Sequence, residues 1–169
     1  LRGKSSMISR LLIAFFLTSY PIIVAFPMVL FFRSSLRYLH ASKPPILHGD
    51  LKARNILCDS RFRAKVCDFG LSTKRKNGIS GTPFWLAPEY LRGKTEYNAS
   101  CDMYSVGIIF NEIYSRKDPY EGEQFKNVLR AVCNPRKNHR PKIPESCPEK
   151  MVVLMKKLWS PGECIDNNL

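Results

Sequence analysis

The stretch ILHGDLKARNILCD, residues 46–59, sets three polar side chains of different chemistry on one short loop. Asp50 supplies a carboxylate, Lys52 an ammonium group and Asn55 an amide, and a strand-like apolar run follows them. A carboxylate so placed can orient or deprotonate a hydroxyl, and the ammonium group can neutralise charge on a phosphoryl group. An amide oxygen is a hard ligand that suits magnesium. We therefore interpret this loop as a candidate catalytic site.

A second carboxylate lies on the segment that follows. NILCD and RAKVCDF read as two short strands, and the turn-like DSRF joins them into a predicted β-hairpin. Such a hairpin would return Asp68, followed by Phe69 and Gly70, to the side of the catalytic loop. Asn55 and Asp68 would then offer two oxygen ligands. Together with a base and a lysine, these ligands suit phosphoryl transfer from a magnesium nucleotide.

Helical patterns dominate the rest of the chain. The stretch 101–115, CDMYSVGIIFNEIYS, is apolar nearly all round and predicts a buried helix. The stretches 123–133 and 148–159 predict amphipathic helices, the second with a proline at its start, where the missing N–H is harmless. SSLRYLHAS, 34–42, reads as the end of another amphipathic helix, which two prolines stop. The predicted fold class is α+β, mainly α.

The composition fits one folded domain in a reducing compartment. The chain has 169 residues, of which 44% are hydrophobic and 24% charged, enough for a single core. Its net charge of +13 favours polyanions, but the basic residues are scattered, so we expect no specific nucleic-acid binding. The cysteines lie far apart without zinc-type spacing, which favours free thiols. They are Cys58, Cys67, Cys101, Cys133, Cys147 and Cys164.

The N-terminal segment, residues 1–33, differs from the rest of the chain in composition. From Leu11 to Phe32 no charge appears in 22 residues, which is long enough to cross a bilayer as a helix. Three interpretations stay open for residues 11–32: a transmembrane helix, a signal-like segment that begins near Met7, and sequence without evolved structure. The flanking arginines and lysine do not fix an orientation for a span.

Four motifs in a fixed order resemble a known family. H-x-D-x-K-x-x-N occurs in HGDLKARN at 48–55, and DFG follows at 68–70. APE stands at 87–89 and DMYSVG at 102–107. In this order the motifs resemble the catalytic half of a eukaryotic protein kinase, that is, its C-terminal lobe. The resemblance implies a catalytic loop at 48–55, with a short β-hairpin at the catalytic site, and an activation segment at 68–89.

The resemblance implies a role for each residue of the motifs. Asp50 would be the catalytic base and Lys52 a phosphate contact. Asn55 and Asp68 would hold Mg²⁺, with ATP as the nucleotide. Leu57 would pack under the adenine ring, although a plain core position explains this leucine equally well.

Further motif residues would support or regulate the site. His48 and Gly70 are motif positions of this kind, and Phe69 would act as a packing switch. Thr82 would brace the catalytic loop from the substrate-binding segment. Asp102 would anchor the same loop from the central helix, and Glu89 is expected to lack the arginine partner that the family provides. Those six positions complete the set of candidate site residues.

The resemblance also suggests a substrate class. Lys52 and the segment GTPFWLAPE, 81–89, resemble the corresponding positions of serine/threonine kinases. The amino-acid sequence of several segments is most similar to the tyrosine-kinase-like group of these kinases. The chain is similar as well to the kinase-homology region of receptor guanylyl cyclases. Many of those regions lack the catalytic aspartate, so the presence of Asp50 favours the active group. The expected partners are ATP and a protein substrate.

The resemblance covers residues 34–159 and matches the larger lobe only. No G-x-G-x-x-G loop precedes it, so we expect the small N-terminal lobe to be absent. The tail, 160–169, diverges, and both ends look like an incomplete or misjoined gene product rather than a deliberately shortened protein. We expect a serine/threonine kinase represented by a truncated catalytic lobe that is inactive alone, in the cytoplasm or anchored to a membrane. The alternative is a non-catalytic, membrane-tethered kinase-like binding module.

Overall fold

The computed structural model describes residues 25–59, 64–69, 80–93 and 96–160. Its elements follow one another in a simple order along the chain. They are α2 (Ala25–His40), η2 (Ala53–Asn55), β1 (Ile56–Cys58), β2 (Ala64–Val66), η3 (Pro83–Trp85), α3 (Pro88–Leu91), α4 (Ala99–Ser115), α5 (Phe125–Val132) and α6 (Glu149–Leu158). The described part is thus helix-rich with a small antiparallel sheet, as the predicted fold class requires.

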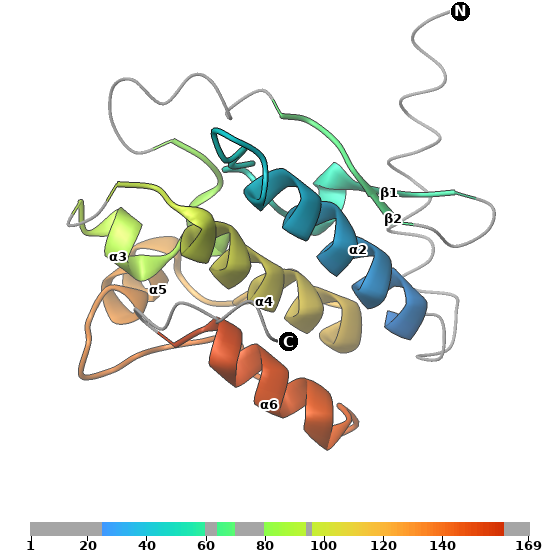
Figure 1. The fold of residues 1–169 in the computed structure, drawn as a ribbon. Coiled ribbons are helices and arrows are strands. Elements are labelled where there is room, and N and C mark those ends of the chain that lie inside the picture. The colour runs from blue at the N-terminus through green and yellow to red at the C-terminus, as the bar shows by residue number, and fades with distance from the viewer. Residues whose placement is uncertain (1–24, 60–63, 70–79, 94–95, 161–169) are drawn as a thin grey trace, which may run out of the picture.

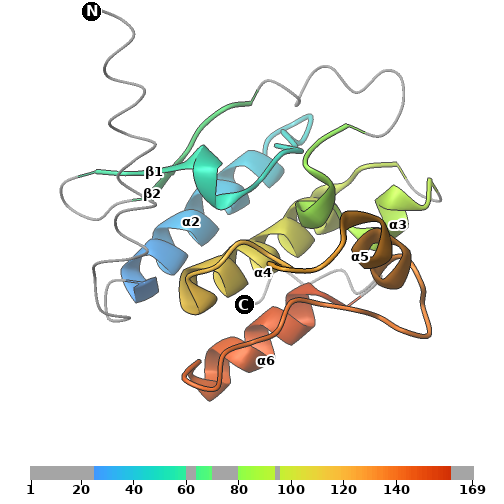
Figure 2. The same ribbon diagram turned by 180° about the vertical axis from the view of Figure 1, so that it is seen from behind.

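Helix α4 runs through the middle of the molecule. Helix α2 lies along one side of it and α6 along the other, as both views show (Figures 1 and 2). The two strands lie beyond α2, whose residues contact β2, and α6 packs against α4. The loop at 48–55, which we call the catalytic loop after its predicted role, contacts α4 through η2 and leads directly into β1.

The first described helix, α2, extends into the apolar N-terminal run. The predicted helix over 34–42 exists, but α2 begins at Ala25, before the boundary predicted between residues 33 and 34. Phe32 and Leu36 are 3% and 2% exposed and join the core of the domain. Two buried side chains one helical turn apart make this helix part of the lobe, so the last residues of the apolar run belong to the fold.

The rest of that apolar run, residues 11–24, lies outside the described residues, and so does the prediction of a span or a signal-like segment there. Within the ranges that the structure describes, no helix is long and apolar enough to cross a membrane. The tail predicted as divergent, 160–169, is described only at its first residue.

The predicted hairpin is confirmed. Strands β1 and β2 pair antiparallel, with Ile56 opposite Val66 and Leu57 opposite Lys65. The pairing continues beyond β2, because the backbone N–H of Cys67 donates to the carbonyl oxygen of Asn55 at 2.9 Å. This bond carries the residue after Cys67 back beside the catalytic loop.

Helix α4 is the buried helix that the apolar pattern predicts. The side chain of Asn98 caps its first turn by accepting from the N–H groups of Ser100 and Cys101. The helix ends where Arg116 adopts a left-handed conformation with φ 60°. Midway, Gly107 lets α6 approach closely, since an added Cβ would lie 2.5 Å from Nε1 of Trp159.

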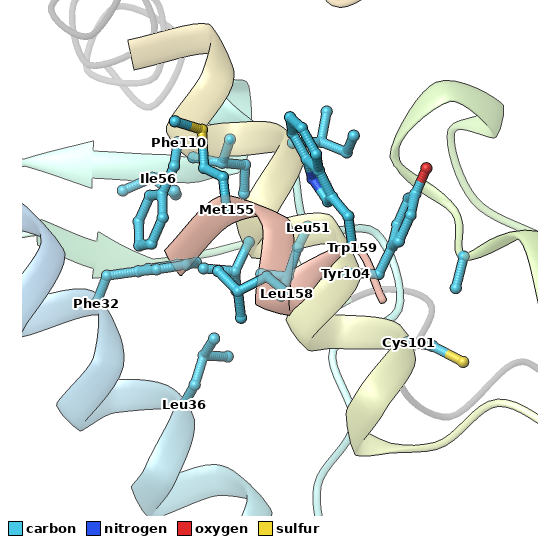
Figure 3. Close-up of a cluster of buried hydrophobic side chains, with 14 of the residues drawn as sticks. Phe32, Leu36, Leu51, Ile56, Cys101, Tyr104, Phe110, Met155, Leu158 and Trp159 are labelled. Carbon is cyan, nitrogen blue, oxygen red and sulfur yellow. The ribbon is translucent and has the colours of Figure 1, made fainter. Parts of the chain in front are cut away.

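The core gathers around α4 from both sides (Figure 3). Helix α2 contributes Phe32 and Leu36, and α6 contributes Met155 and Leu158, all buried. Fully burying one such side chain stabilises the fold by about 1.5–3 kcal/mol. Predicted helices α5 and α6 are both confirmed, and α5 covers a second, smaller cluster of apolar side chains.

Candidate active site

The carboxylate of Asp50 is held mainly by two neighbours from different parts of the chain, with a longer hydrogen bond of 3.4 Å from Nδ2 of Asn55. Its Oδ2 accepts a hydrogen bond from Nζ of Lys52 at 2.7 Å. Its Oδ1 accepts from the backbone N–H of Thr82 at 3.0 Å and from the Thr82 hydroxyl at 2.6 Å. Nζ of Lys52 also donates to that hydroxyl at 2.9 Å, which closes a ring of polar contacts. The structure thus brings these three predicted residues together.

Electrostatics keep this carboxylate ionised at neutral pH. Partial burial raises the pKa of Asp50, but the hydrogen bonds from Lys52 and Thr82 and the charge of Lys52 outweigh it, so the pKa lies below 3.8. The side chain is 13% exposed and that of Lys52 23%, so both groups can reach a substrate. An ionised, reachable carboxylate is suited to accept a hydroxyl hydrogen bond.

Asn55 and Asp68 occupy neighbouring places on the two sides of the hairpin base. Nδ2 of Asn55 donates to the carbonyl oxygen of Asp50 at 2.8 Å, which leaves Oδ1 of the amide as the atom for a cation. Asp68 is exposed and has φ 67°, a left-handed conformation that only some polar residues tolerate. Among the described residues, no group of three or more His, Cys, Asp or Glu could hold a metal ion.

His48 ties the catalytic loop to the strand end before Asp68. Its ring is buried, and Nδ1 accepts from the backbone N–H of Asp50 at 3.2 Å. The proton therefore sits on Nε2, which donates to the carbonyl oxygen of Cys67 at 2.9 Å. The ring of Phe69 packs against it, with centroids 4.8 Å apart. The remaining motif residue, Gly70, lies outside the described residues.

Asp102, in the first turn of α4, anchors this loop from below. Oδ2 accepts from the backbone N–H of His48 and from Nε2 of His40, both at 2.9 Å. Oδ1 accepts from the backbone N–H of Gly49 at 3.0 Å and from the hydroxyl of Tyr97. The loop can present its amides this way because Gly49 has φ 82°, where a side chain would be strained.

Burial and hydrogen bonding pull the pKa of Asp102 in opposite directions. The side chain is inaccessible to water, which raises the pKa, but the hydrogen bonds it accepts outweigh this and lower it below 3.8. The position at the start of α4 also favours negative charge. His40 and Tyr97 were not among the predicted site residues, since nothing in their local sequence indicates a contact with Asp102.

The segment 80–87, which we call the substrate-binding segment, is fitted closely against the loop. Gly81 has φ 122°, and an added Cβ would lie 3.0 Å from the carbonyl oxygen of Gly49 and 2.9 Å from Cδ2 of Leu86. Only glycine fits there without a shift. This fit lets the next residue, Thr82, reach Asp50.

A further carboxylate beneath the site escaped the sequence prediction. Glu112, near the end of α4, is 5% exposed, and its Oε2 accepts from Nε1 of Trp85 at 2.6 Å. The backbone N–H of Ala53 donates to the same oxygen at 3.4 Å. Burial raises the pKa of Glu112 from 4.5 to about 7. A charged residue beyond Asp102, in the apolar part of the helix pattern, was the signal that could have identified it.

Two predicted residues lie outside these contacts. Leu57 is half-buried in β1, opposite Lys65. Glu89 lies in the first turn of α3, and its Oε2 is buried without a hydrogen-bond partner among the described residues. A buried carboxylate oxygen without a hydrogen-bond partner costs free energy of folding.

Comparison with known proteins points in one direction. The protein kinase domain family matches residues 27–163 of this chain. The dual specificity protein kinase shkA of Dictyostelium discoideum is 38% identical over 135 residues, covering 74% of this chain and 25% of that protein. The probable serine/threonine-protein kinase drkB of the same organism is 42% identical over 135 residues, covering 78% of this chain and 18% of that protein.

A viral relative shows the same pattern. The putative serine/threonine-protein kinase/receptor R826 of Acanthamoeba polyphaga mimivirus is 39% identical over 128 residues, covering 73% of this chain and 8% of that protein. The chain therefore spans a quarter or less of the length of these three relatives.

Proposed function

The chain belongs to the protein kinase family, and from that premise we propose that it is the catalytic C-terminal lobe of a serine/threonine kinase of the tyrosine-kinase-like group. The observation that carries the proposal is the ring of contacts among Asp50, Lys52 and Thr82. It joins an ionised base, a cation and the substrate-binding segment within hydrogen-bonding distance of one another.

In this proposal each residue of the ring has a task at a stated atom. Asp50 orients the hydroxyl of a protein substrate through a carboxylate oxygen and takes up its proton. Lys52 directs Nζ toward the same place, where it stabilises negative charge on the phosphoryl oxygens. Thr82 holds both side chains, so that the base and the cation keep a fixed separation. The lowered pKa of Asp50 keeps the base ionised over the whole neutral range.

The chain offers ligand atoms that fit a magnesium nucleotide. When bound, Mg·ATP supplies the phosphoryl group; Oδ1 of Asn55 and the carboxylate of Asp68 would hold the metal, and Leu57 would face the adenine. Both ligands carry hard oxygens, Asp68 is exposed, and Asn55 is oriented by its bond to Asp50. Two protein oxygens are few for Mg²⁺, so the fit requires oxygens of the nucleotide as well.

The 169 residues on their own are proposed to be inactive. They contain no G-x-G-x-x-G loop and no strand lysine to clamp the phosphates, so a nucleotide would face water on one side. Losing such a clamp costs several kcal/mol of transition-state stabilisation, or roughly three decades in rate. The protein substrate and its sequence preference lie beyond this proposal.

The test measures incorporation of labelled phosphate from ATP and Mg²⁺ into a basic substrate protein. We expect none from the chain alone. Placed behind a complete nucleotide-binding lobe, the chain should label serine and threonine, and Asp50→Ala should abolish the labelling while the surface variant Glu121→Gln retains it. Absence of labelling by the extended protein overturns the proposed kinase activity. Labelling by the chain alone that Asp50→Ala removes overturns only the proposed inactivity.

A second candidate is a non-catalytic kinase-like module tethered to a membrane through residues 11–32. Its support is the uncharged run in the sequence, and Cys133 and Cys147, which carry free thiols, agree with a cytoplasmic lobe. Carbonate extraction tests the tether, since a tethered chain stays in the membrane pellet and a variant without 11–24 leaves it. Release of the intact chain by carbonate excludes the tether.

A further inference from the structure

Glu112 joins two segments that the proposed reaction requires to be aligned. Nε1 of Trp85, in the substrate-binding segment, donates to Oε2 at 2.6 Å. The backbone N–H of Ala53, in the catalytic loop two residues before the metal ligand Asn55, donates to the same oxygen at 3.4 Å. One carboxylate oxygen therefore receives hydrogen bonds from both sides of the site, although it touches none of the reacting groups (that is, Asp50, Lys52 or the ligands).

The surroundings of this carboxylate are nearly dry. Glu112 is 5% exposed, and Trp85 and Ala53 cover it from η3 and η2. The charged side chains that act on it are Arg54, from the catalytic loop, which favours the ionised form, and Asp118, beyond the end of α4, which disfavours it. Neither outweighs burial, which raises the pKa to about 7.

Building on the proposed function, we propose that Glu112 is a positioning residue, which aligns the substrate-binding segment with the catalytic loop while it is ionised and loosens that alignment when it takes up a proton. Hydrogen bonds to an ionised acceptor are roughly twice as strong as those between neutral groups. Above neutral pH both donors meet a carboxylate, and below it they meet a neutral acid.

The consequence is a pH-dependent geometry that the reacting residues themselves do not explain. Asp50 stays ionised throughout the neutral range, because its pKa is lowered, so it contributes no change near pH 7. A step near pH 7 that moves Trp85 and Ala53 together, and that Glu112→Gln removes, is therefore assigned to Glu112. A residue that merely filled space would leave the signals of these two donors independent of pH.

The test is an NMR titration of the 169-residue chain from pH 5.5 to 8.5, which needs no catalysis. The indole N–H of Trp85 is identified by its loss in Trp85→Phe, which separates it from that of Trp159. We expect the indole signal and the amide signal of Ala53 to shift together with one midpoint near pH 7. In Glu112→Gln both titrations should vanish. Glu121→Gln removes an exposed carboxylate from the segment that follows α4, and it should leave both titrations unchanged.

A second variant keeps the carboxylate and so guards against misfolding of Glu112→Gln. Trp85→Phe removes the donor that lowers the pKa of Glu112, so the Ala53 signal should still titrate, with a midpoint above that of the wild type. Flat signals in the wild type, titrations that persist in Glu112→Gln, or a lower midpoint in Trp85→Phe would each overturn the proposal.

A kinetic measurement then links the geometry to catalysis. In the protein carrying this chain behind a nucleotide-binding lobe, kcat/KM for a protein substrate should rise severalfold between pH 6 and 8, and Glu112→Gln should flatten that rise. If the NMR titration behaves as expected but no phosphate is transferred by any form, the proposed function fails while the positioning role of Glu112 stands. A flat wild-type profile in an active enzyme overturns the positioning role alone.

Discussion

The two ends of α4 carry buried carboxylates that behave in opposite ways. Asp102, in the first turn, is inaccessible to water, and Glu112, in the last turns, is 5% exposed. Nevertheless the pKa of Asp102 is lowered and that of Glu112 is raised to about 7. Burial disfavours charge at both ends, so burial alone does not decide the ionisation state of a carboxylate.

Hydrogen-bond donors and helix position decide it instead. Asp102 accepts four hydrogen bonds and lies at the end of the helix where the backbone dipole favours negative charge. Glu112 accepts two, one of them long at 3.4 Å, near the end where the dipole disfavours it. The first end is therefore a fixed anchor for the catalytic loop, and the second is adjustable near neutral pH.

The largest effect should come from breaking the anchor. Asp102→Asn replaces an ionised acceptor with an amide whose NH₂ group faces donors, and leaves buried groups unpaired. Leaving several buried donors without their charged acceptor, at about 1–3 kcal/mol for each, should cost more than about 3 kcal/mol of unfolding free energy. Urea denaturation at pH 7 measures it, with Glu121→Gln as the exposed control, which should change stability by less than about 0.5 kcal/mol. Equal stability of Asp102→Asn and the wild type contradicts the comparison.

Glu112, at the adjustable end of α4, should make the free energy of unfolding depend on pH. Because the folded-state pKa of Glu112 is raised from 4.5 to about 7, its contribution to stability is fully present below pH 4.5 and lost as the pH rises through 7. That difference corresponds to about 3 kcal/mol. Glu112→Gln has no such loss, so relative to the wild type it should gain about 3 kcal/mol between pH 4.5 and 8.

Urea denaturation at a series of pH values measures this gain, and a constant difference between the two proteins would rule it out. Retaining the glutamate costs stability above neutral pH, which is the range where its ionised form aligns the site, so stability and positioning oppose each other at this residue.

A smaller effect should follow from removing one donor of the anchor. His40→Ala deletes the Nε2 contact to Asp102 and should cost about 1.5–3 kcal/mol, as expected for a hydrogen bond to a charged group. The lowered pKa of Asp102 gives stability that is present above pH 3.8 and lost as the pH falls below it. His40→Ala should therefore unfold at a higher pH than the wild type on acid titration, followed by circular dichroism. An unchanged acid midpoint would argue against His40 as a supporting donor.

The smallest expected effect concerns the charges around Glu112. Arg54 lowers the pKa of Glu112 from an exposed position, so Arg54→Ala should raise the midpoint of the Ala53 titration slightly. The change in stability should stay below about 1 kcal/mol, since exposed charges are screened by water and salt. An unchanged or lower midpoint in Arg54→Ala would mean that the charge of Arg54 does not lower the pKa of Glu112.

Local sequence patterns determined most of the secondary structure described here. The hairpin and the helices at 99–115, 125–132 and 149–158 follow from periodicity and turn residues, which depend on neighbours in the chain. The order of the motifs indicated the family, which the comparison with known proteins confirms. The assignment of roles to Asp50, Lys52, Asn55 and Asp68 stays a prediction, although the structure brings the first three into contact.

Only the tertiary structure decided which buried groups meet. Phe32 joins the core from a run that reads as a membrane span, because hydrophobicity alone does not distinguish a bilayer from a protein interior. His40 reaches Asp102 across 62 positions of sequence, and Trp85 reaches Glu112 across 27. The sequence places two carboxylates on one helix, but their opposite pKa shifts depend on donors from distant segments, and only the folded chain brings those donors to them.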